Sequence, residues 1–171
     1  MTDASRAATI DDLKTLVVSL NERGVEYLLI GGYALAAHGY HRATVDIDLL
    51  VPASRETGHA LRQALLVLPD KAARDIDPDW FEEGDNIRVA DEIVVDVMFN
   101  AAGETFETLQ AFAETIELDG VPLRTVNLEG LLRTKQGLRE KDVADRRVLE
   151  AALRSVRKNE APGPRNEGGD S

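Results

Sequence analysis

The chain has 171 residues, enough for one domain with a hydrophobic core, and 43% of its residues are hydrophobic and 30% charged. The formal net charge of −11 disfavours a non-specific nucleic-acid coat, because binding to phosphates needs a positive field. Cysteine is absent, which excludes disulfides, thiolate metal sites and a cysteine nucleophile. An apolar leader and a long apolar run are also absent, so we expect a cytoplasmic protein that does not enter a membrane.

The first half of the chain alternates predicted helices and strands. Leu13, Leu16, Val17 and Leu20 recur at helical spacing and predict a helix over 11–23. The other elements predicted in this half are strands at 26–30 and 45–51 and helices at 33–38 and 55–68.

The second half predicts a loop, two hairpins and a helical end. The segments in order are a loop at 69–85, strands at 86–90 and 92–99, a helix at 105–114, strands at 115–118 and 122–126, and helices at 128–138 and 141–157. Asp119–Gly120 is the strongest hairpin signal in the chain. Together the elements predict an α/β (α+β) fold over 1–157, with a mixed sheet, flanking helices and a C-terminal helical cap. Residues 158–171 are almost free of apolar side chains and are expected to form a disordered tail.

Two carboxylates stand two residues apart in the strand predicted at 45–51. Residues i and i+2 of a strand point to the same face, so we expect Asp46 and Asp48 side by side, with Val45 and its alternate neighbours directed into the core. A divalent cation with oxygen ligands, Mg²⁺ or Mn²⁺, is a common counter-charge for such a pair. Ordinary alternation on a strand with one solvated face is the alternative explanation.

A third acid and a pair of glycines extend this pattern. Asp96 interrupts the apolar run 93–99. If that strand lies beside 45–51, the three carboxylates form a cluster able to hold two metal ions during phosphoryl chemistry. Gly31 and Gly32 end one predicted strand and open a helix, where glycine lets a phosphate approach the backbone. Without the acids, the glycine pair would indicate only a turn.

The combined pattern is an apolar residue, Gly-Gly, a spacer of thirteen residues, Asp-apolar-Asp-apolar and a later isolated Asp. It resembles the nucleotidyltransferase superfamily of the DNA polymerase β type over about residues 10–155. Segments 31–34 and 42–48 resemble small bacterial members, including minimal nucleotidyltransferases and the AbiEii-type toxins of toxin–antitoxin systems. The resemblance implies that a nucleoside monophosphate is moved from an NTP to an acceptor hydroxyl or phosphate, with release of pyrophosphate.

The resemblance also implies roles for individual residues. The implied metal ligands and catalytic residues are Asp46, Asp48 and Asp96. The implied substrate-binding residues are Gly31, Gly32, Arg42 and Lys135. Asp96 is in addition a candidate general base for the incoming hydroxyl. Two alternatives stay open: Arg42 pairs with the acids and holds its loop, and Lys135 belongs to a solvated helix face with Lys141, Asp142 and Asp145.

The sequence leaves the acceptor open between tRNA, a protein hydroxyl and a small molecule, and a cognate antitoxin is a candidate partner. One alternative function is a catalytically degenerate regulatory or toxin–antitoxin protein with the same fold. Another is a metal-dependent phosphohydrolase that uses the same acids. Trp80 and Phe81 are expected to anchor the loop at 69–85, with stacking on a base as the alternative.

Overall fold

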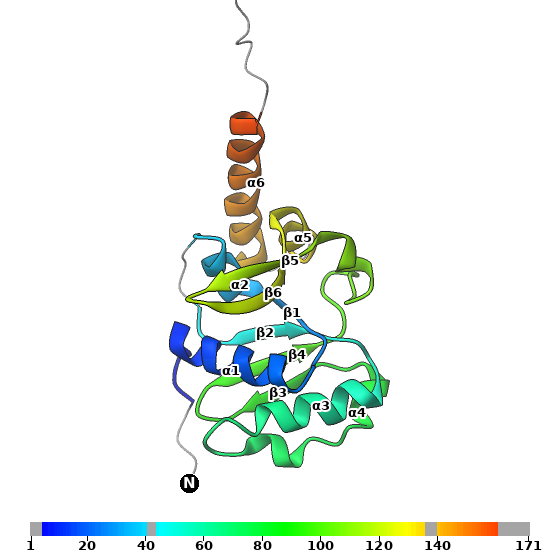
Figure 1. Ribbon diagram of the computed structural model, residues 1–171. Coiled ribbons are helices and arrows are strands. Elements are labelled where there is room, and N and C mark those ends of the chain that lie inside the picture. The colour runs from blue at the N-terminus through cyan, green and yellow to red at the C-terminus, as the bar shows by residue number, and fades with distance from the viewer. Residues whose placement is uncertain (1–4, 41–43, 136–139, 161–171) are drawn as a thin grey trace, which may run out of the picture.

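The computed structural model describes residues 5–40, 44–135 and 140–160. Its centre is a six-stranded mixed sheet in the order β3-β4-β2-β1-β6-β5 (Figure 1). The strands are β1 (Leu28–Ile30), β2 (Ile47–Leu50), β3 (Ile87–Ala90), β4 (Val94–Met98), β5 (Ala113–Leu118) and β6 (Val121–Val126). The helices are α1 (Ile10–Glu22), α2 (Gly31–Ala37), α3 (Arg55–Leu65), α4 (Trp80–Glu83), α5 (Leu128–Arg133) and α6 (Glu140–Glu160), with 3₁₀ turns η1 (Ala72–Asp75) and η2 (Thr108–Phe112). The predicted mixed α/β class is confirmed.

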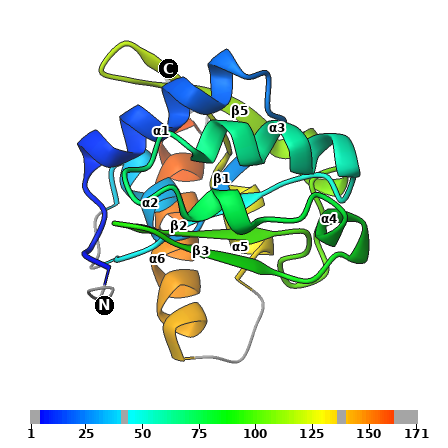
Figure 2. The same ribbon diagram turned by 90° about the horizontal axis from the view of Figure 1, so that it is seen from below.

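Helices cover both sides of the sheet. Helices α1 and α3 lie side by side on one face, and α5 and α6 lie on the opposite side (Figures 1 and 2). The core beneath α1 and α3 is made of fully buried aliphatic side chains, because each helix turns one apolar stripe toward the sheet. They include Leu13, Leu16 and Leu20 of α1, Leu61 and Leu65 of α3, and Ile47 and Leu49 of β2.

None of the described helices combines the length and the apolarity needed to cross a membrane.

Strand β2 lies near the middle of the sheet, with a different partner on each side. It runs antiparallel to β1 and parallel to β4. Its apolar residues Ile47 and Leu49 are fully buried, while Asp48 between them is only half-buried. The alternation directs the acid to the face of the sheet opposite the apolar side chains.

The N-terminal segment ties together the two parts of the chain that carry the glycines and the first acids. The hydroxyl of Tyr33, in the first turns of α2, donates a hydrogen bond to the carbonyl of Ala8. The backbone N–H of Ala8 in turn donates to the carbonyl of Val45, at 3.1 Å. Burial, with the charges of Asp12 and Asp46 nearby, raises the pKa of the Tyr33 hydroxyl, so it stays protonated and able to donate.

Three local predictions are wrong. Val45 precedes β2 and is 55% exposed, so it does not point into the core. The helix predicted at 105–114 is the 3₁₀ turn η2 followed directly by β5, because Phe106, Leu109 and Phe112 recur every third residue, which fits a 3₁₀ turn. The polar segment 69–85 is not a plain loop, since it contains η1 and the single turn α4.

The predicted hairpin and the C-terminal helix are present. Asp119 and Gly120 both have positive φ, of 50° and 84°, as a tight two-residue turn requires. Helix α6 runs to Glu160, three residues beyond its predicted end. The rest of the predicted tail lies outside the described residues.

Candidate functional site

Two of the three acids lie on neighbouring strands, and the third lies next to the first of these strands. In the sheet register, Asp48 of β2 is the direct neighbour of Asp96 of β4. Neighbouring residues of paired strands point to the same face, so both carboxylates lie on the side opposite the core of α1 and α3. Asp46 stands one residue before β2. The condition set in the sequence analysis, that the strand of Asp96 lies beside the strand of Asp48, is met.

An arginine that the sequence analysis did not single out joins two of these acids. Arg88 of β3 is the register partner of Asp96 across the β3–β4 hairpin. Its guanidinium donates to Asp96 Oδ1 and Oδ2 at 3.2 and 3.3 Å and to Asp46 Oδ2 at 3.1 Å. Arg88, Asp96 and Asp48 therefore form one row across three strands. The side chain of Arg88 is 61% exposed, whereas those of Asp46 and Asp96 are 24% and 23% exposed.

The three acids fit a divalent metal ion in the chemistry of their side chains. Asp46, Asp48 and Asp96 all offer carboxylate oxygens, the ligand type that Mg²⁺ and Mn²⁺ prefer. In residues 5–40, 44–135 and 140–160, however, no group of three or more acid or histidine side chains is close enough together to hold a metal ion. Arg88 supplies the positive charge between Asp46 and Asp96 instead.

Gly31 faces the carboxylate of Asp48. The backbone turns from β1 into α2 at this residue with a φ of 78°, in the region that favours glycine. A Cβ built on Gly31 would lie 2.2 Å from Oδ2 of Asp48. Position 31 therefore requires glycine for two reasons. The backbone has a positive φ, and a Cβ would occupy the space of the Asp48 carboxylate.

The other predicted substrate-binding residues lie in different places. Gly32 is buried in the first turn of α2, directly after Gly31. Arg42 lies outside the described residues. Lys135 follows α5 and is buried, with its side chain 8% exposed.

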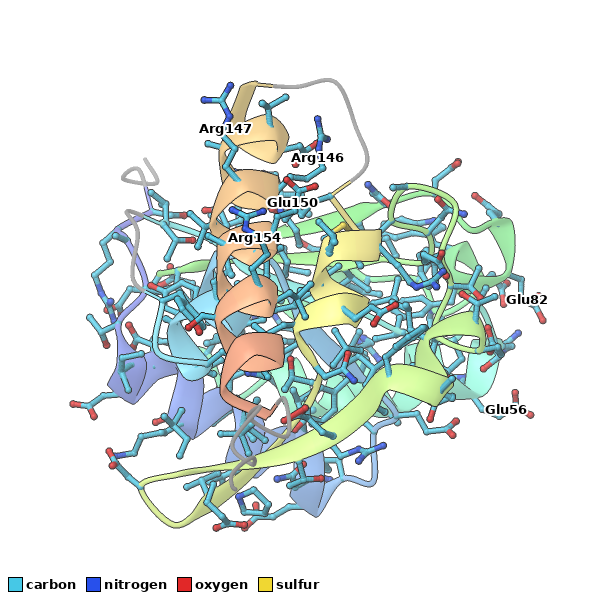
Figure 3. The ribbon with its side chains drawn as sticks, turned by 90° about the horizontal axis from the view of Figure 1, so that it is seen from above. Glu56, Glu82, Arg146, Arg147, Glu150 and Arg154 are labelled. Atoms are coloured by element: carbon cyan, nitrogen blue, oxygen red, sulfur yellow. The ribbon has the colours of Figure 1, made fainter. Side chains whose placement is uncertain are left out.

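Lys135 is part of an ion-pair network inside the C-terminal helical cap. Its Nζ lies 3.2 Å from Oδ2 of Asp145 and 3.7 Å from Oδ1 of Asp142, both on α6. Asp145 is 1% and Asp142 5% exposed. Arg146 donates to the backbone carbonyl of Lys135 at 2.6 Å, and Figure 3 shows Arg146 near the start of α6. The solvated helix face considered from the sequence is therefore wrong for Lys135, Asp142 and Asp145.

We expect Lys135→Met to destabilise the fold strongly. The substitution keeps the length of the side chain and leaves two buried carboxylates without this ammonium, a change that costs about 3–5 kcal/mol in comparable pairs. Chemical denaturation measures the loss. The matched control is Lys14→Met, which removes an ammonium paired with Asp119 at 3.1 Å on the surface and should cost far less, because exposed ion pairs contribute little to stability. Equal losses for the two variants would contradict a structural role for the Lys135 network.

The two aromatic residues of segment 69–85 have different roles. Phe81 is fully buried and packs edge-on against Phe99, with ring centroids 5.3 Å apart, so its predicted anchoring role is confirmed. Trp80 is 40% exposed and lines an open cavity together with Arg88. The predicted anchoring role is therefore wrong for Trp80.

Comparisons with known proteins point to one fold. No protein-family model matches the chain, and no curated protein matches it by sequence. A crystal structure described as a candidate nucleotidyltransferase from Thermotoga maritima matches with a TM-score of 0.53 and 16% identity, over 88% of this chain and 92% of that one. The solution structure of the antibiotic-resistance factor ANT(2'')-Ia matches with a TM-score of 0.50 and 17% identity, over 88% and 93%. At such identity the likeness establishes the fold and not the activity.

Proposed function

Because the chain shares the fold of known nucleotidyltransferases, we propose that this protein is a metal-dependent nucleotidyltransferase. It moves a nucleoside monophosphate from an NTP to an acceptor hydroxyl or phosphate and releases pyrophosphate. The observation that carries the proposal is the placement of Asp48 beside Asp96 on paired strands, with the Asp48 carboxylate against Gly31 at the start of α2. The likeness of 88% of the chain to two solved structures of this fold supports it.

The three acids and the glycine pair each have a part in the proposed reaction. The acceptor oxygen forms a bond to the α-phosphorus, the bond from that phosphorus to the bridging oxygen breaks, and pyrophosphate leaves. Asp96 accepts the proton of the acceptor hydroxyl. Asp46, Asp48 and Asp96 are the residues that would hold Mg²⁺ or Mn²⁺, which when bound neutralises phosphate charge. The backbone of Gly31 and Gly32 contacts the triphosphate.

Arg88 favours one alternative, a catalytically degenerate member of the fold with a regulatory or toxin–antitoxin role. An arginine already neutralises part of the charge of Asp46 and Asp96. If the arginine were a permanent substitute for metal, nucleotide binding would be absent or independent of Mg²⁺. The exposure of the Arg88 side chain favours the catalytic proposal. The ion pairs of an exposed arginine are weak, so a divalent ion can displace the guanidinium from the acids.

We expect NTP binding that requires a divalent metal ion. Three carboxylates repel a triphosphate unless a cation lies between them, so calorimetric titration of ATP, GTP, CTP and UTP should show binding with Mg²⁺ and little with EDTA. Failure of all four nucleotides to bind with Mg²⁺ present would contradict the proposed function.

A further inference from the structure

An open cavity of about 350 Å³ adjoins the row of acids. It is lined by Trp80, Glu83, Asp85, Asn86, Ile87 and Arg88. Arg88 belongs both to this wall and to the ion pairs with Asp46 and Asp96, so this side chain connects the cavity to the candidate site. Its volume is at the lower end of the range for small-molecule sites.

The strand order places this cavity on one particular side of the acids. Gly31, where the triphosphate is proposed to bind, follows β1, and β2 and β4 come next in the sheet. Strand β3, which carries Arg88, is the edge strand beyond β4. In a phosphoryl transfer the attacking oxygen and the leaving oxygen lie roughly in line on opposite sides of the phosphorus. The acceptor should therefore approach from the side of Asp96 and β3, where the cavity lies.

The lining of the cavity indicates the chemistry of the acceptor. Trp80 offers a partly exposed indole, on which an apolar ring face can lie. Glu83 and Asp85 are exposed, and neither makes an ion pair within the described part of the chain. Among the residues that line the cavity, Arg88 is the one cation, and it is paired with two acids outside the wall. The wall carries two carboxylates against one guanidinium, so its formal charge stays negative even when a metal ion displaces Arg88 from the acids, which suits a cationic ligand and repels a polyanion.

Resting on the proposed function, we propose that the Trp80 cavity is the acceptor site. It takes a small molecule with hydroxyl groups, whose ring face lies on Trp80 and whose ammonium groups pair with Glu83 and Asp85. Nucleic-acid acceptors are disfavoured by the same charges. The acidic balance of the chain agrees with this choice, since the formal net charge is −11.

The test uses the single tryptophan of the chain as its reporter. A deacetylated glucosamine trimer is titrated at about pH 6 and low salt, without nucleotide or metal, while Trp80 emission and the one indole N–H NMR signal are followed. The matched probe is the fully N-acetylated trimer, which keeps rings and hydroxyls and lacks the charges. We expect saturable changes with the amine form and much weaker changes with the acetylated form or with bulk tRNA.

Variants locate the binding. Glu83→Gln and Asp85→Asn should each weaken binding of the amine trimer roughly two- to fivefold, the scale of an exposed ion pair. The control is Glu82→Gln: Glu82 is exposed on the same short helix but does not line the cavity, and Figure 3 shows it directed outward. Equal effects of the three substitutions, binding of tRNA or the neutral trimer as tight as that of the amine, or no change of Trp80 would overturn the proposal. Since this titration contains no NTP, such a failure leaves metal-dependent nucleotide binding as a separate result.

Discussion

Asp48→Asn should reduce nucleotidyl transfer by about a hundredfold or more while the protein stays folded. The substitution keeps the volume of the side chain and removes a charge from the reacting centre, where losses of this size are common. Asp46→Asn should act in the same direction. It also removes one contact of Arg88, but that arginine is 61% exposed, so the stability lost should be about 1 kcal/mol or less. NTP turnover and thermal melting, measured together, check both expectations.

Magnesium dependence of the melting temperature separates a ligand from a structural acid. A ligand that binds only the folded state raises its stability, so the parent should melt at higher temperature as Mg²⁺ increases and Asp48→Asn should not. Asp119→Asn is the matched control, because Asp119 is an exposed acid paired with Lys14 far from the row. It should keep both the turnover and the Mg²⁺ response of the parent. Full turnover of Asp46→Asn and Asp48→Asn would show that the acids are structural.

Gly31→Ala should lower stability and transfer together. A left-handed conformation costs a residue with a Cβ about 1–2 kcal/mol, and the new Cβ would lie 2.2 Å from Oδ2 of Asp48. The carboxylate must then move away from its place beside Asp96. We expect a lower free energy of unfolding and a loss of turnover close to that of Asp48→Asn.

Gly24→Ala isolates the contribution of backbone strain. Gly24 has a φ of 66°, similar to that of Gly31, and a Cβ there would meet nothing within 4 Å. This control should lose about 1–2 kcal/mol of stability and keep full turnover. If Gly31→Ala also kept full turnover, the close approach of Gly31 and Asp48 would have no functional meaning.

Periodicity in the sequence was enough to predict the class of fold and most of its elements. Repeats of apolar residues placed α1 and α3, and the Asp119–Gly120 turn placed the β5–β6 hairpin. The helix predicted at 105–114 is wrong because Phe106, Leu109 and Phe112 recur every third residue, which fits the 3₁₀ turn η2 better than an α-helix. The position of Val45 failed because alternation was extended past the start of β2, where the backbone pairs with the N-terminal segment at Ala8.

The candidate site could be predicted in part. The positions of Asp46, Asp48 and Asp96 between apolar residues indicated a functional site, because charges in such positions have no role in packing. Arg88 was missed, although counting the register across the tight turn near residue 91 would have placed it opposite Asp96. Burial of the Lys135 network could not be predicted, because its acids are one helical turn apart, a spacing that surface and buried faces share.

The most direct test of nucleotidyl transfer follows the two ends of the triphosphate separately. The protein is incubated with Mg²⁺, a cell extract and NTPs that carry a label on either the α- or the γ-phosphate. The account predicts that the α-label becomes attached to an acceptor, that the γ-label leaves as pyrophosphate, and that Asp48→Asn does neither. Release of the γ-label as orthophosphate with no α-labelled product, or equal labelling by Asp48→Asn, would contradict it.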